Sequence, residues 1–73
     1  MIHVIERNEQ FGIQIFRTSD LAQAREFVIE GGFPEANEAA QDMEAAFFDN
    51  LMADVYVVID SRGDKYDFEV MSV

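Results

Sequence analysis

At the start of the chain, residues 2–7 are rich in β-branched and apolar side chains, and hydrophobic and polar residues alternate over residues 11–17. Alternation with a period of two residues is typical of a β-strand that is covered on one face. In the second segment, the more hydrophobic face carries Phe11, Ile13 and Ile15. The polar turn over residues 8–10 is short enough to join the two segments, so we expect them to form an antiparallel β-hairpin.

The pattern then changes to the spacing of a helix. One hydrophobic stripe is formed by Leu21, Ala24, Phe27 and Val28. The preceding Thr18-Ser19-Asp20 predicts a helix start with a hydroxyl cap and an acid in the first turn. Gly31-Gly32 predicts its end, because glycine readily adopts the left-handed conformation that closes a helix.

A second helix is predicted from Phe33-Pro34 to about Ala53, because proline is well tolerated at the first helical position. Steps of four and three residues separate the members of its hydrophobic stripe, which are Ala36, Ala40, Met43, Phe47 and Leu51. Such an amphipathic stripe indicates a helix that packs on a core.

Residues 54–60 and 66–73 complete the pattern as two strands joined by a turn over 61–64. The chain is therefore predicted to be one α+β domain over residues 1–73. We expect a four-stranded antiparallel sheet in ββααββ order with two helices on one face. The predicted core comprises Ile13, Ile15, Val28, Met43, Phe47, Leu51, Val57 and Ile59.

The last strand is hydrophobic on both faces, at Val70, Met71 and Val73. Two interpretations are open: the strand is central in the sheet, or it pairs with another chain. An unpaired strand edge invites pairing, so a homodimer is one expected state.

Composition excludes several kinds of site. The 73 residues include no cysteine and one histidine, His3, so disulfides, thiolate zinc sites and multi-histidine metal sites are not expected. No phosphate-binding glycine loop or nucleophile motif is present. We therefore expect no enzyme, cofactor or metal. The chain shows no apolar run long enough to span a membrane and no signal-peptide pattern, so a cytoplasmic protein is expected.

Charge gives the strongest functional indication. Fifteen acidic residues against five basic ones give a formal net charge of -10. No Lys or Arg occurs from Glu26 to Asp60, a stretch that holds nine acids. Direct binding to nucleic acid or to an anionic membrane is disfavoured, because like charges repel, and a basic protein partner is favoured.

On the second predicted helix, four carboxylates fall within about 60° of one another along about 21 Å. They belong to Glu35, Glu38, Asp42 and Asp49. The stripe is either a solvated helix face or a surface that fits a basic groove, such as one that holds DNA or RNA. A duplex strand of the same length carries about six phosphates. A nucleic-acid mimic would therefore also need Glu26, Glu30, Glu44 and Asp54.

Phe48 and Met52 lie one helical turn apart and outside the main hydrophobic stripe. Two interpretations are open for them as well. They widen the buried face of the helix, or they are exposed anchors for a partner, since aromatic residues and methionine are enriched at interface centres.

As a class, small acidic single-domain chains without catalytic residues resemble phage or mobile-element inhibitors, including anti-CRISPR proteins and DNA mimics. This resemblance rests on charge and size and on no matched motif. The sequence thus favours a binding protein that blocks or modulates a basic, nucleic-acid-handling partner. The alternative is a small self-associating structural or accessory subunit.

Overall fold

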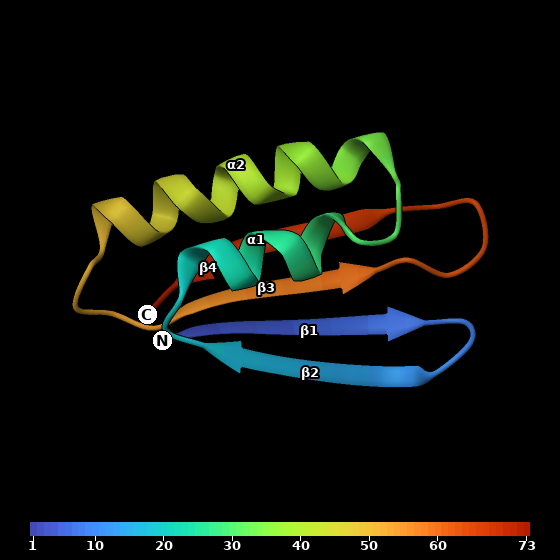
Figure 1. Cartoon of the computed structure of the whole chain (residues 1–73), viewed down its shortest axis with the longest axis horizontal. Helices are drawn as coiled ribbons and strands as arrows, with labels where there is room; N and C mark the ends of the chain where they lie inside the picture. Colours follow the sequence, from blue (N-terminus) through green and yellow to red (C-terminus); the bar gives the residue numbers. More distant parts are fainter.

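A computed structural model describes all 73 residues and contains four strands and two helices in the predicted ββααββ order. The elements are β1 (Ile2–Asn8), β2 (Gly12–Thr18), α1 (Leu21–Ile29), α2 (Pro34–Asp49), β3 (Val55–Asp60) and β4 (Asp67–Ser72). Both helices lie on the same face of the sheet, and the two chain ends lie at the same end of it (Figure 1). Neither helix is long and apolar enough to cross a membrane.

The prediction of a fully antiparallel sheet is wrong. The strand order is β2-β1-β3-β4, and the central pair β1·β3 is parallel. The pairs β1·β2 and β3·β4 are antiparallel hairpins, as expected. The sheet is therefore mixed, and its two hairpins meet along their first strands.

The two helices cause the parallel pairing. The chain leaves β2 at the end of the sheet where β1 begins, runs out along α1 and returns along α2 (Figure 1). As a result, β3 starts at the same end as β1 and runs in the same direction. The strand β3 is also the most hydrophobic of the four, with only Asp60 as a charged residue, so a central position buries it best.

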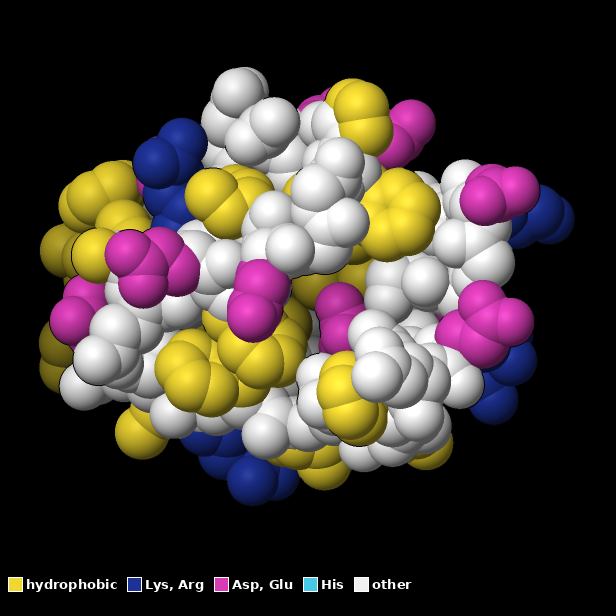
Figure 2. All heavy atoms as spheres, turned by 45° about the vertical axis from the view of Figure 1, so that its right-hand side comes forward, with side chains coloured by type: hydrophobic (Ala, Val, Ile, Leu, Met, Phe, Trp, Pro, Cys, Tyr) yellow, Lys and Arg dark blue, Asp and Glu magenta, His cyan; other side chains and the backbone are white.

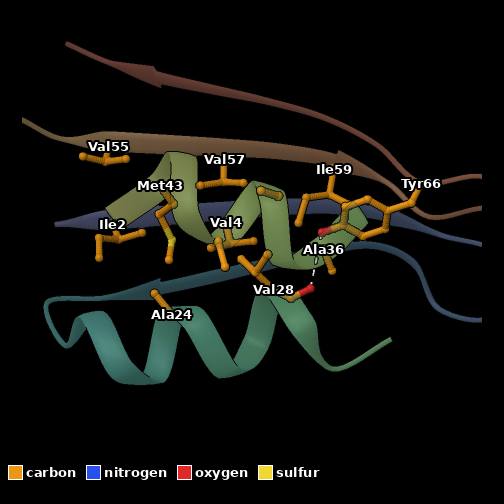
Figure 3. Close-up of a cluster of buried hydrophobic side chains, with 12 residues drawn as sticks. Ile2, Val4, Ala24, Val28, Ala36, Met43, Val55, Val57, Ile59 and Tyr66 are labelled. Carbon is orange, nitrogen blue, oxygen red and sulfur yellow. Dashed lines mark hydrogen bonds between the residues drawn. The ribbon is translucent and has the colours of Figure 1, made fainter. Parts of the chain in front are cut away.

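The core lies between the helices and one face of the sheet (Figure 3). Twelve residues are buried, and all are hydrophobic: Ile2, Val4, Ala24, Val28, Ala36, Ala39, Ala40, Met43, Val55, Val57, Ile59 and Tyr66. Three of the four buried residues of α2 are alanines, and the fourth is Met43. Phe16 of β2 stacks on Phe27 of α1 with ring centroids 4.7 Å apart, which extends the core towards β2.

The start of α1 differs in detail from the expectation. The cap is the carboxylate of Asp20, whose Oδ1 accepts hydrogen bonds from the backbone N of Ala22 at 2.9 Å and of Gln23 at 3.4 Å. The Thr18 hydroxyl oxygen instead accepts a hydrogen bond from the backbone N of Asp20 at 3.0 Å. Gly32, with φ of 76°, follows the end of the helix as predicted.

Three of the predicted core residues are exposed. Ile13 and Ile15 are 66% and 54% exposed, because the register of β2 turns them away from the helices. Leu51 is 64% exposed, because α2 ends at Asp49, earlier than the predicted Ala53. Phe47 is partly buried and packs against the core, while the other predicted core residues are buried.

Replacing Met43 should strongly destabilise the fold. Met43→Ala removes a fully buried side chain and should lower the free energy of unfolding by about 2–5 kcal/mol. Leu51→Ala is the matched control, since its side chain is largely exposed, and should change this free energy by less than about 0.5 kcal/mol. Urea denaturation of both variants measures the difference. Equal losses would contradict the observed end of α2.

Candidate acidic binding surface

The four predicted stripe carboxylates are all exposed on α2. We call them the acidic stripe: Glu35, Glu38, Asp42 and Asp49. At about 100° per residue, the stripe lies about 120° around the helix from the buried side chains. It therefore flanks the buried face and does not lie opposite to it. The flank is the one away from α1, so the stripe runs beside the edge strand β4.

None of the four stripe carboxylates has an ion pair within the chain. The four ion pairs of the structure involve Asp54, twice, and Glu44 and Asp60. Unpaired carboxylates that share one flank of a helix repel one another by a few tenths of a kcal/mol per pair. The stripe is thus a surface whose negative charge is not offset by neighbouring side chains.

The other four acids of the predicted site lie in different parts of the structure. Glu44 lies on the opposite flank of α2, where Arg25 Nε of α1 approaches Glu44 Oε1 at 2.9 Å. Asp54 Oδ1 lies 3.8 Å from the N-terminal amine and 3.4 Å from His3 Nε2, although the histidine contact lacks hydrogen-bond geometry. Glu26 is exposed on α1, and Glu30 is exposed directly after its end. The structure therefore does not bring these four acids into the stripe.

Phe48 and Met52 do not widen the core. Phe48 is 62% exposed, and Met52 is fully exposed beyond the end of α2. Phe48 contacts the edge of the Phe47 ring, with centroids 5.4 Å apart. It points about 100° around the helix from Asp49. A partner that contacted both residues would have to cover the C-terminal end of α2.

A recess that the sequence did not reveal opens at the end of the sheet where β1 and β3 stop. Its volume is about 450 Å³, and its walls contain two carboxylates, three phenylalanine rings and no Lys or Arg. The main lining residues are Glu6, Glu30, Phe11, Phe27, Phe33 and Tyr66. Acidic and hydrophobic side chains surround a hollow in Figure 2, and basic side chains lie towards the margins of the view.

The chemistry of the recess suits a positively charged group. Carboxylates attract a cation, and aromatic faces stabilise it further by cation–π contact. Phe33 lines the recess just before α2 begins, so the recess opens near the start of that helix. The lining comes from three stretches that are far apart in the chain, residues 6–14, 27–33 and 61–66, which explains why no local pattern in the sequence predicts it.

Tyr66 closes one wall of the recess and connects it to the core. Its hydroxyl donates a hydrogen bond of 3.3 Å to the backbone oxygen of Val28, as drawn in Figure 3. Burial raises the pKa of Tyr66 to about 12, and the negative charge of Glu6 adds to the shift. The phenol therefore stays neutral well above the pH at which an ordinary tyrosine ionises.

The free energy of unfolding should fall at alkaline pH because the Tyr66 phenol ionises more readily in the unfolded chain. Its pKa is about 10 when unfolded and about 12 when folded, so its contribution is complete below pH 10 and is lost as the pH rises through 12. The absorbance difference between wild type and Tyr66→Phe should give a phenolate titration with a midpoint near 12. A midpoint near 10 would show that the hydroxyl is not buried.

Comparison with known proteins gives no relative from which a function could be transferred. No protein-family model matches the chain, and no curated protein and no solved structure matches it. A function for the chain has to be inferred from its own residues and their arrangement.

Proposed function

We propose that the protein binds a basic protein partner through the acidic stripe of α2 and acts by covering the partner's basic surface, without catalysis. The observation that carries this proposal is that all four stripe carboxylates are exposed and have no ion pair within the chain. A helix selected only for stability would place basic side chains among them.

Electrostatic attraction supports fast and selective association. Adjacent stripe carboxylates lie within about one Debye length of each other at physiological salt, so a basic surface is attracted by several charges at once. Such steering raises the association rate and disfavours acidic competitors. Its effect on the affinity of the final complex is smaller. Affinity then needs a second, less polar contact.

The recess and the end of α2 offer two such contacts. The recess combines Glu6 and Glu30 with aromatic walls, which suits an inserted arginine or lysine side chain. At the other end of α2, Phe48 and Met52 present exposed apolar surface. Buried aromatic contacts at interface centres supply much of the binding energy in protein complexes.

The partner we favour is a protein whose basic groove normally holds nucleic acid. The stripe extends over about 21 Å and follows one edge of the molecule. The pairing of Glu44 with Arg25 removes one of the charges that a phosphate-by-phosphate mimic would need. We therefore propose that the stripe occupies part of such a groove and that apolar contacts complete the complex.

Changing Glu35, Glu38, Asp42 and Asp49 to Gln tests the proposal. The helix should keep or gain stability, because repulsion is relieved and glutamine is a fair helix former. A partner captured by the wild-type protein from its native host's lysate should associate at least about tenfold more slowly with the variant at low salt. The difference should shrink at high salt, where steering is screened.

A matched pair of variants separates the effect of the stripe on the association rate from the effect of net charge. Glu38→Gln/Asp42→Gln removes two charges from the stripe, and Glu9→Gln/Asp64→Asn removes two from the exposed turns at one end of the sheet. Only the stripe pair should slow association with the captured partner. Equal rates for the wild type and the quadruple variant at low salt would show that the stripe is a solvated helix face.

A further inference from the structure

The face of the sheet that points away from the helices has no covering element. The strand register places three rows of side chains across it from β2 to β4. The rows are Arg17–His3–Tyr56–Met71, Ile15–Ile5–Val58–Glu69 and Ile13–Arg7–Asp60–Asp67. We call these twelve side chains the open face.

Hydrophobic side chains lie across the open face. Ile13 and Ile15 on β2, Val58 on β3 and Met71 on β4 are exposed, and Ile5 on β1 is partly exposed. His3 stacks on Tyr56 with ring centroids 4.5 Å apart and an interplanar angle of 10°, which makes a flat aromatic area on the next row. Contiguous apolar patches of this kind on a small protein usually mark an interaction surface.

The charges of the open face are divided between its two halves. Arg7 and Arg17 stand on the β1–β2 half, and Asp67 and Glu69 stand on β4. None of these four has an ion pair within the chain. Asp60, on β3, is already held by Arg62, with contacts of 2.9 and 2.8 Å. The unpaired basic charges of the face thus lie on one half of it and the unpaired acidic charges on the other.

We propose that the open face is covered by the open face of a second copy, related by a two-fold axis parallel to the strands. This axis lays β1 of one copy over β3 of the other, and β2 over β4. The basic half of each copy then meets the acidic half of the other, and Ile5 lies over Val58 near the centre. Packing of two aligned sheets at about 10 Å is a common arrangement.

The charge pattern selects this axis over its alternative. A two-fold axis perpendicular to the strands lays β2 over β2 and β4 over β4, which places like charges together. Like-charge contacts across an interface are unfavourable. The acidic stripe, by contrast, lies in the helix layer on the other side of the sheet, so the dimer leaves it exposed.

The size of the domain gives a second reason for association. Only twelve residues are buried, and four of them are alanines, whereas domains of this length commonly gain stability by oligomerising. The open face covers about 400 Å² of flat area at ordinary strand spacing. Side chains add to this, but the face stays near the lower end of stable interfaces, which bury about 800 Å² per partner. We therefore expect dissociation in the micromolar range.

Sedimentation velocity of the wild type across the micromolar range tests the dimer. Ile15→Glu places a carboxylate opposite Glu69 of the other copy and should raise the dissociation constant at least about tenfold, or about 1.4 kcal/mol. Leu51→Glu is the matched control, because Leu51 is similarly exposed but lies outside the open face. It should leave the dissociation constant unchanged. Thermal melts confirm that both variants are folded.

A mixing experiment tests the pairing of charges across the interface. Arg7→Glu/Arg17→Glu makes both halves of the face acidic, and Asp67→Lys/Glu69→Lys makes both of them basic. Each variant alone should sediment as a monomer, and an equimolar mixture of the two should form a heterodimer, because an acidic face then meets a basic one.

Three results would overturn this proposal. The first is a wild type that sediments at 8.3 kDa throughout, which would assign the open face to a different protein. The second is a dimer that Ile15→Glu does not weaken, which would indicate pairing along the edge of β4. The third is a mixture of the charge variants that remains monomeric. None of these results bears on binding by the acidic stripe, so the two proposals fail independently.

Discussion

The parallel pairing of β1 with β3 determines most of the structure. It places β1 and β3 at the centre and leaves the hairpin partners β2 and β4 at the edges. Both central strands carry hydrophobic residues on both faces, while the chain has only two helices and both cover the same face (Figure 1). One face becomes the core, and the other stays exposed with its isoleucines and valine.

The same arrangement separates the charges of the molecule. Arg25 lies on α1 and neutralises Glu44 on the inner flank of α2, so the outer flank keeps only carboxylates. Of the remaining basic residues, Arg7 and Arg17 lie on the open face, on the side of the sheet that points away from the helices. A negative surface on the helix layer is therefore compatible with the proposed pairing of two copies through the sheet layer. On this account, the dimer would present two acidic stripes to basic partners.

Local sequence patterns predicted the helices and strands well. They failed for features that depend on contacts between residues far apart in the chain. The two hairpins, Pro34 at the start of α2 and the burial of Met43 follow from spacing and end signals. In β2 both faces are hydrophobic, so the choice between Ile15 and Phe16 as the buried side depended on the contact of Phe16 with Phe27. The parallel pairing of β1 with β3 could not be predicted without knowing the direction in which the two helices bring the chain back to the sheet. The acidic stripe was visible as helical spacing, but the Arg25–Glu44 pair and the recess join segments that are far apart in the chain.

Carboxyl footprinting by carbodiimide labelling, read by mass spectrometry, tests the two-surface account most directly, because the stripe and the acidic edge of the open face are reported in one experiment. Without a partner, Glu35, Glu38, Asp42 and Asp49 should label fully at every protein concentration, whereas Asp67 and Glu69 should become protected as the concentration rises. Addition of the captured basic partner should then protect the stripe. Stripe labelling that is unchanged by the partner, together with labelling of Asp67 and Glu69 that is independent of concentration, would contradict the account.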